Sequence, residues 1–386
     1  MEKMELGIDV FVKKYLSKFR GLQIGLVTNA TGVNSDLRRN IDLFLENGLK
    51  VVKLFGPEHG VFGTAPDGEK LSDFIDPKYG IPVYSLYGEK LRPTEDMLKG
   101  IDVLVYDIQD VGLRFYTYIY TMIYCMEECA KYGVRFVVLD RPDPLSCKIE
   151  GPVVKKEFES FVGGYGLALR YGMTPGELAK YVNAAFRIGA DLCVIEMEDY
   201  EPSLFYDEAG LLWNTPSPNL PSLEHTILYE GFCLLEGVNV SVGRGTVHPF
   251  KYIGAPWIDS ERFYREIKKL SPAGVVFRER VFLPAAFKLQ NKPCYGLEFF
   301  VTDRREIKPL HLAVDVISTL RRIHPYDFRW DSYFHGDNER YHFDLLIGDD
   351  FYRKAIEDGA LSKDFEQIWE SESEQFENII GKFRIY

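Results

Sequence analysis

Short apolar runs recur through the first half of the chain and alternate with longer segments whose apolar residues follow a helical period. The apolar runs span residues 22–27, 51–55, 103–106, 136–139 and 192–195. The helix-like segments span residues 36–46, 118–131 and 175–187, and the last begins with Thr174 as N-cap and Pro175 at the first helical position. This alternation predicts an α/β fold with a doubly wound, mostly parallel sheet that is covered on both faces.

The pattern changes in the second half of the chain. Proline and glycine become frequent between Thr215 and Trp257, which predicts long surface loops rather than regular elements. Helical and strand periods return after Asp259, with a strand expected over 296–302 and helices over 310–322 and 364–383. Because 386 residues exceed the length at which one core usually stops growing, we expect two domains, 1–258 and a smaller α/β (α+β) domain at 259–386.

Charge and composition narrow the range of partners. The net charge of −12 at pH 7 repels phosphate backbones and anionic membrane surfaces, so neither nucleic acid nor a membrane is expected as a partner. The first residues lack the basic segment and apolar stretch of a secretory signal, which predicts a cytoplasmic location, or an extracytoplasmic one if a leader has been removed. The six cysteines form no CxxC pair, so we expect them to be reduced and structural.

Polar side chains follow four successive strands of the predicted sheet. They are Asn29 after the first strand, Glu58 and His59 after the second, Asp107, Gln109 and Asp110 after the third, and Asp140, Arg141 and Asp143 after the fourth. Because the carboxyl ends of parallel strands meet at one edge, we expect these side chains to gather around one crevice. Asn and Asp also favour turns and helix caps, and this alternative stays open for Asn29, Asp107 and Asp143. Glu and Gln are poor turn formers, which favours a functional role for Glu58 and Gln109.

The segment after the third strand adds Arg114, Tyr116 and Tyr118. Tyrosine rings give a sugar a flat apolar face with hydroxyl partners, and a guanidinium can bind a carboxylate with two hydrogen bonds. The alternative for the tyrosines is an ordinary place at the rim of the core.

Several familiar mechanisms lack their motifs. The chain has no GxGxxG fingerprint for a nicotinamide, no phosphate-binding Gly-Lys-Ser/Thr loop and no GxSxG nucleophile elbow. A cation among His59 and the neighbouring aspartates stays open as an oxygen-rich, magnesium-type site, because a single His argues against zinc.

Long blocks of sequence in one order carry a resemblance to a known family. They include residues 26–33, 54–60, 82–88, 107–118, 139–142, 172–179, 216–219, 243–246 and 254–257. On these blocks, and over nearly its whole length, the chain resembles the exo-β-N-acetylmuramidases. The resemblance implies removal of terminal N-acetylmuramic acid (MurNAc) from the non-reducing end of wall saccharides, with or without attached peptide. It also implies a Rossmann-like domain, a smaller C-terminal domain that closes the cleft, and no cofactor.

Catalytic roles follow from the resemblance as hypotheses. Glu58, in the family's Pro-Glu-His-Gly motif, is the candidate proton donor, and we expect burial beside other carboxylates to raise its pKa. His59 would orient Glu58 or bind the substrate. Asp110 is the first candidate for the second carboxylate, ahead of Glu236 and Glu69, although capping of the next helix is an equal alternative for it. A route in which the sugar's own acetamido group attacks stays open.

The candidate substrate-binding residues are Asn29, Gln109, Arg114, Tyr116, Tyr118, Asp140, Arg141, Asn219 and Arg244. Arg114, Arg141 and Arg244 are candidates for the lactyl carboxylate of MurNAc, because a planar guanidinium matches a carboxylate. Arg141 has the alternative of a structural pair with Asp140 or Asp143.

Three positions depart from the family's usual pattern: Phe62 in place of a basic residue, Tyr171 in place of His, and Val242 in place of Glu. The last argues against any mechanism that needs a carboxylate there. A metal-dependent hydrolase and a non-catalytic sugar-binding module are the rival functions.

Overall fold

The computed structural model describes residues 4–63, 72–335 and 338–386. The chain folds into two compact units, the first formed by residues 1–148, 171–218 and 378–386 and the second by residues 149–170 and 219–377. The sequence places residues 219–258 in the first domain, whereas the structure groups them with the second unit. The reason is that this segment supplies a helix and a strand to the second unit's own core.

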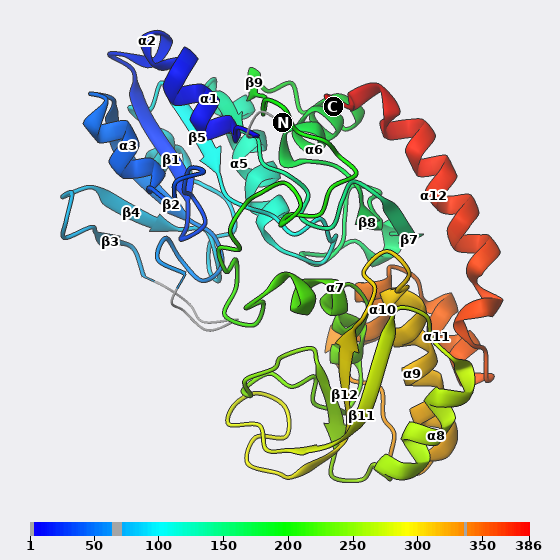
Figure 1. Ribbon diagram of the computed structural model, residues 1–386. Coiled ribbons are helices and arrows are strands. Elements are labelled where there is room, and N and C mark those ends of the chain that lie inside the picture. The colour runs from blue at the N-terminus through cyan, green and yellow to red at the C-terminus, as the bar shows by residue number, and fades with distance from the viewer. Residues whose placement is uncertain (1–3, 64–71, 336–337) are drawn as a thin grey trace. The chain divides into compact units, whose positions relative to one another are not determined.

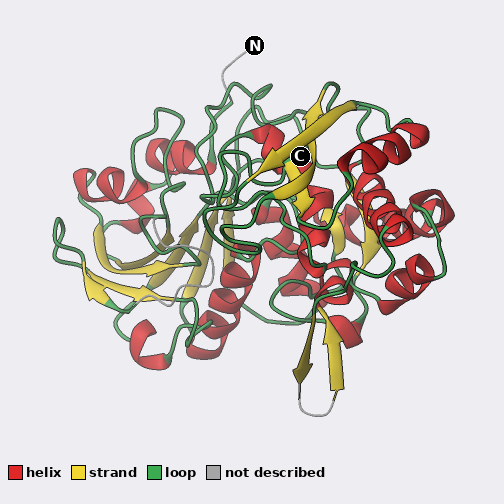
Figure 2. Ribbon diagram, turned by 90° about the horizontal axis from the view of Figure 1, so that it is seen from below, coloured by secondary structure: helices red, strands yellow, loops and turns green. Residues whose placement is uncertain are grey.

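The first unit is built on a seven-stranded sheet in the order β3-β4-β2-β1-β5-β6-β9 (Figures 1 and 2). Its strands are β1 (Gln23–Thr28), β2 (Lys50–Gly56), β3 (Phe74–Ile75), β4 (Pro82–Ser85), β5 (Val103–Asp107), β6 (Arg135–Leu139) and β9 (Leu192–Ile195). Neighbouring strands are parallel except β3 and β4. The chain runs from β1 through β2 to β4 and then returns to β5 on the other side of β1. The strand order therefore reverses beside β1, which confirms the predicted doubly wound sheet.

The helices of the first unit are α1 (Gly7–Lys14), α2 (Leu16–Phe19), α3 (Asn40–Glu46), α4 (Glu95–Leu98), α5 (Tyr118–Tyr132), α6 (Pro175–Ala185) and the 3-10 turn η4 (Gly381–Phe383). The predicted N-cap of α6 is confirmed, because the Thr174 hydroxyl accepts from the Glu177 N–H at 3.2 Å and the Glu177 carboxylate accepts from the Thr174 N–H at 3.0 Å. All five residues of β5 are buried, as a central parallel strand requires.

The second unit contains a three-stranded antiparallel sheet in the order β10-β12-β11. Its strands are β10 (Tyr252–Ala255), β11 (Val275–Phe282) and β12 (Cys294–Val301). Two separate two-stranded sheets pair β7 (Ile149–Val153) with β8 (Ala168–Tyr171) and β13 (Ser332–His335) with β14 (Asn338–Tyr341). Its helices are α7 (Leu223–Phe232), α8 (Ser260–Leu270), α9 (Pro309–Ile323), α10 (His342–Ile347), α11 (Asp350–Glu357), α12 (Glu366–Ile380), and the 3-10 turns η1 (Lys156–Phe158), η2 (Cys233–Gly237) and η3 (Ser362–Asp364).

The prediction of loops over 215–257 is wrong for part of that segment. Residues 223–232 form α7, which is buried from His225 to Phe232, and 252–255 form β10, which pairs with β12. The sequence did not reveal this helix because its buried residues include the polar His225, Thr226 and Glu230, so the segment lacks the amphipathic period that marks a surface helix. Among the residues that the structure describes, none of the helices is long and apolar enough to cross a membrane.

Candidate active site

The turn after β2 presents Glu58 at the carboxyl edge of the first unit's sheet. Its next two residues have left-handed backbones, with φ of 68° at His59 and 72° at Gly60. Glycine adopts this conformation freely, whereas a histidine holds it at some cost in free energy. Such local strain is typical of functional turns that the surrounding structure fixes in place.

Hydroxyl groups hold the Glu58 carboxylate. Thr117 Oγ1 donates to Glu58 Oε2 at 2.7 Å, and the Tyr87 hydroxyl also hydrogen-bonds to this carboxylate. Burial, followed by the negative charge of Glu58, raises the pKa of Tyr87, so this tyrosine stays a donor. Glu58 is only partly buried, whereas His59 is 5% exposed and Asp110 is 2% exposed. Of the three predicted catalytic side chains, Glu58 is therefore the one placed to meet a ligand.

Three predicted binding residues lie close to Glu58. The Tyr118 hydroxyl donates to the Pro216 carbonyl oxygen at 2.6 Å and hydrogen-bonds with the Tyr116 and Asn29 side chains. The Tyr116 and Tyr118 rings meet edge to face with centroids 4.7 Å apart. Burial raises the pKa of Tyr118, and the nearby charge of Glu58 adds to that effect. The structure thus brings Asn29, Tyr116 and Tyr118 together with Glu58.

Asp110 lies deeper than Glu58 and is held by donors. Its Oδ2 accepts from the Gly112 N–H at 2.7 Å and from the Tyr171 hydroxyl. Burial raises the pKa of Asp110 to about 7, because the charged form loses its hydration, and the Tyr171 and backbone hydrogen bonds oppose that rise. Tyr171, one of the three departures noted in the sequence, therefore acts as a hydrogen-bond partner of Asp110.

Arg141 forms an internal ion pair. Its Nε and Nη2 lie 2.7 and 2.6 Å from Asp107 Oδ1, and Nη2 also donates to the Val33 carbonyl oxygen at 2.8 Å. Arg141 is 1% exposed and Asp107 is 0% exposed. Arg141 thus forms a structural ion pair, which was the alternative to substrate binding. Its partner is Asp107, however, and not Asp140 or Asp143. The pair ties the end of β5 to the end of β6.

Asp140 anchors the start of α6 and the last residue of the chain. Its carboxylate accepts from the Thr174 hydroxyl at 2.8 Å, the Gly176 N–H at 2.7 Å and the Tyr386 hydroxyl at 2.8 Å. Burial raises the pKa of Asp140 to about 7, and these three hydrogen bonds oppose the rise. The contacts of Asp140 are those of a structural residue.

The raised pKa of Asp140 predicts a stability that depends on pH. Between an ordinary Asp pKa of about 3.9 and the folded value of about 7, the folded state keeps a proton that the unfolded chain has released. This contribution to the free energy of unfolding is complete below about pH 4 and is lost as the pH rises through 7. The difference in free energy of unfolding between the wild type and Asp140→Asn should therefore change by about 1 kcal/mol per pH unit between pH 5 and 7. Denaturant titrations at several pH values measure it, and parallel curves would contradict the assignment.

Gln109 and Arg114 are also buried, at 2% and 0% exposure. Gln109 Nε2 donates to the carbonyl oxygens of Asp110 and Pro142, both at 2.8 Å, so this side chain connects the turns after β5 and β6. The Arg114 carbonyl oxygen accepts from the Tyr120 hydroxyl at 2.7 Å. Because both side chains are buried, we infer that they support the turn that leads to Thr117.

Two predicted binding residues, Asn219 and Arg244, belong to the second unit. Arg244 pairs with Glu236 through two contacts, Nε to Oε1 at 2.6 Å and Nη2 to Oε2 at 3.2 Å. The guanidinium face expected to bind a substrate carboxylate is therefore occupied by Glu236, which was itself a candidate for the second catalytic carboxylate. Glu69, the other candidate, lies outside the described residues.

Tyr87 and Thr117 were missed from the sequence although both contact Glu58. Each lies in a block that resembles the family, at 82–88 and 107–118, and this was the available signal. Their hydroxyls could not be assigned to Glu58 because the contact joins three separate turns. Among the residues with a described placement, no three or more His, Cys, Asp or Glu side chains are grouped so as to hold a metal ion.

Comparisons with known proteins point to one family along nearly the whole chain. The family described as exo-beta-N-acetylmuramidase NamZ matches with its N-terminal part at residues 24–224 and its C-terminal part at residues 227–386. Peptidoglycan beta-N-acetylmuramidase NamZ of Bacillus subtilis (strain 168) is 42% identical over 386 residues, which cover 100% of this chain and 92% of that protein.

Solved structures agree with this comparison. Crystal structures of two DUF1343 family proteins from Bacteroides fragilis NCTC 9343 are each 30% identical to this chain. The first has a TM-score of 0.89 and covers 100% of both chains, and the second has a TM-score of 0.79 and covers 99% of both.

Proposed function

The chain belongs to the exo-β-N-acetylmuramidase family, and on that basis we propose that it releases terminal MurNAc from the non-reducing end of peptidoglycan fragments such as MurNAc-GlcNAc, where GlcNAc is N-acetylglucosamine. The chain is a glycosidase, and wall saccharides are its substrates. The observation that carries the assignment of its site is the partly exposed Glu58 carboxylate, held by hydroxyl groups at the carboxyl edge of the parallel sheet.

Glu58 acts as the proton donor to the leaving oxygen. Glycoside cleavage passes through an oxocarbenium-like state and needs a positioned acid at the bond that breaks. The Thr117 and Tyr87 hydroxyls fix the carboxyl group, and Tyr116 and Tyr118 provide aromatic surface beside it. His59 lies buried in the turn that carries Glu58, which suits a role in orienting Glu58.

Asp110 supports this site from behind. Its burial and its bonds to Tyr171 and Gly112 suit a group that holds the turn after β5, which leads to Thr117. A carboxylate in that position does not meet the sugar. This favours the route in which the acetamido group of MurNAc itself attacks the anomeric carbon.

The direct test of the activity is incubation of the full chain with MurNAc-GlcNAc. We expect free MurNAc and free GlcNAc in equal amounts, and no cleavage of GlcNAc-MurNAc, whose non-reducing sugar is not MurNAc. Binding without release of either sugar would favour a sugar-binding module instead. Activity that is lost with a chelator and restored by Mg²⁺ would favour a metal-dependent hydrolase.

Thr117→Val should lower kcat for MurNAc release about 10- to 100-fold with little change in KM. The substitution keeps the shape of the side chain but removes a hydrogen bond to a charged group, which is worth about 1.5–3 kcal/mol. Steady-state kinetics on MurNAc-GlcNAc measure the effect. Thr117→Ser keeps the hydroxyl and should recover most of the rate, and equal losses in both variants would show that the methyl group, not the hydrogen bond, matters.

A further inference from the structure

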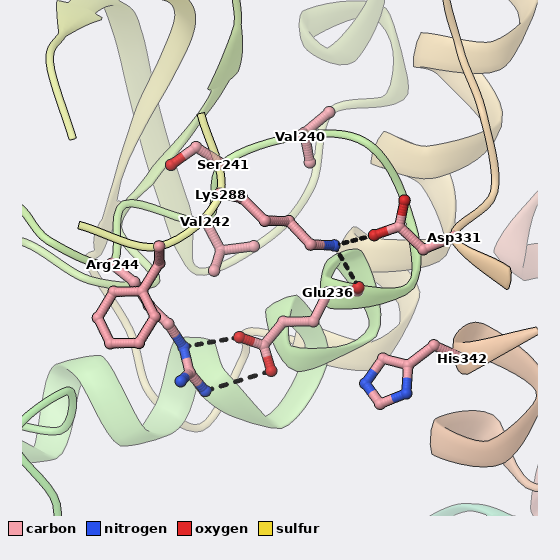
Figure 3. A pocket seen from close by; sticks show the side chains of 9 residues that line it. Glu236, Val240, Ser241, Val242, Arg244, Lys288, Asp331 and His342 are labelled. Atoms are coloured by element: carbon pink, nitrogen blue, oxygen red, sulfur yellow. Dashed lines mark hydrogen bonds and ion pairs between the residues drawn. The ribbon is translucent and has the colours of Figure 1, made fainter. Parts of the chain in front are cut away.

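The second unit contains a cavity of about 350 Å³ that the proposed catalytic site does not explain (Figure 3). The residues that line it are Glu236 in η2, residues 240–242 with Arg244, Phe287 with Lys288, and Asp331 with His342. A volume of this size lies at the lower end of the range of about 300–1,000 Å³ that small-molecule sites occupy. It suits one small ligand.

The charged groups on its walls neutralise one another. Figure 3 shows the Arg244 guanidinium facing the Glu236 carboxylate, with the two contacts of 2.6 and 3.2 Å given above. The Lys288 ammonium pairs with the Asp331 carboxylate and donates to the Val238 carbonyl oxygen at 2.9 Å. Two positive and two negative side chains thus leave no net charge on the cavity.

Separating the Arg244–Glu236 pair would be costly, because its two side chains are only 18% and 21% exposed, whereas the Lys288–Asp331 pair is more exposed, at 40% and 36%. A charged ligand would have to displace one partner and leave the other without its counter-ion in a partly buried place. An uncharged ligand with hydroxyl and amide groups avoids this cost, because paired ions still accept and donate hydrogen bonds at their remaining positions. The charge pattern therefore selects neutral ligands.

The rest of the wall is apolar. Val240, Val242 and Phe287 line the cavity, and Phe287 is 43% exposed. The Arg244 guanidinium lies 5.6 Å from the centroid of the Phe287 ring, which keeps that ring in place beside the ion pair. His342, also on the wall, has its pKa lowered by burial and then by Lys288, so it adds no charge at neutral pH. Valine methyls and an aromatic ring beside polar groups are what a pyranose with an acetyl group requires.

We propose that this cavity is a binding site for an uncharged N-acetylated pyranose, namely N-acetylglucosamine. The preference for a neutral ligand comes from the cavity alone. The choice of this sugar rests on the proposed function, because the two sugars of the substrate differ in charge. MurNAc carries a lactyl carboxylate and is disfavoured by the paired ions, whereas N-acetylglucosamine is neutral.

Calorimetric titration of the full chain with the methyl β-glycoside of N-acetylglucosamine tests the proposal. We expect saturable binding that Phe287→Ala weakens at least tenfold, with an unchanged thermal midpoint, because the exposed ring contributes little to the fold. Absence of binding to the wild type, or binding that Phe287→Ala leaves unaltered, would overturn the proposal.

A second variant tests the charge argument. Glu236→Gln leaves the positive charge of Arg244 unpaired, so the ratio of affinities should shift about tenfold toward free MurNAc and away from the neutral sugar. Glu306→Gln removes an exposed carboxylate elsewhere in the second unit and should leave the ratio unaltered. An unchanged ratio in Glu236→Gln would overturn the proposal.

The two proposals fail independently. Hydrolysis of MurNAc-GlcNAc without binding of the neutral sugar overturns the cavity inference and leaves the proposed function in place. Binding that depends on Phe287, without hydrolysis, supports the cavity inference and overturns the proposed function.

Discussion

Glu58→Gln should lower kcat for hydrolysis of MurNAc-GlcNAc by about 10²- to 10⁴-fold, the usual contribution of a general acid. Glutamine keeps the shape of the side chain and can still accept from Thr117, but it has no proton to give to the departing oxygen. The loss should be much smaller for the p-nitrophenyl glycoside of MurNAc, because that leaving group departs without protonation. Steady-state rates on the two substrates measure this difference.

Two controls make the Glu58 prediction specific. Glu89→Gln removes an exposed carboxylate of the same unit and should leave the rate unaltered. Glu58→Asp keeps a titrating group at a shorter reach and should retain more activity than Glu58→Gln. Near-normal hydrolysis of the disaccharide by Glu58→Gln would remove Glu58 from the role of proton donor.

Arg141→Ala should destabilise the first unit by about 3–5 kcal/mol, the cost of breaking a buried ion pair. Asp107 would remain buried at 0% exposure, and the Asn40 side-chain amide would still donate to its carboxylate at 2.9 Å. On folding, the Asp107 carboxylate would lose its water without gaining the charge and hydrogen bonds of Arg141 in return. The free energy of unfolding should therefore fall. Chemical denaturation followed by circular dichroism measures the change in the transition of this unit.

A double variant separates the ion pair from simple loss of packing. Asp107→Asn combined with Arg141→Ala removes both charges, so it should be less destabilised than Arg141→Ala alone. An exposed ion pair serves as a comparison. Arg38→Ala breaks the exposed pair with Glu46 and should lower the free energy of unfolding by less than about 1 kcal/mol. If the single and double variants at position 141 lose equal stability, the charge of Asp107 is not the cause.

The sequence by itself determined five of the seven strands of the first unit's sheet. Five apolar runs became β1, β2, β5, β6 and β9, because buried parallel strands need a nearly continuous apolar run. The start of α6 at Thr174 was equally visible, since a capping box is made by residues three apart in the chain. The edge that carries Glu58 followed from the rule for parallel sheets, which needs only the order of strands and turns.

Only the tertiary structure decided which polar groups face a ligand and which face one another. Arg141 and Arg244 looked alike as candidates for a carboxylate, yet they pair with Asp107 and Glu236. The hydroxyls that hold Glu58 come from Thr117 and Tyr87, and the buried helix 223–232 was expected to be a loop. The physical reason is common to these cases. Strand and cap signals are local, whereas the partner of a buried charge or hydroxyl is set by distances between segments that the order of residues does not contain.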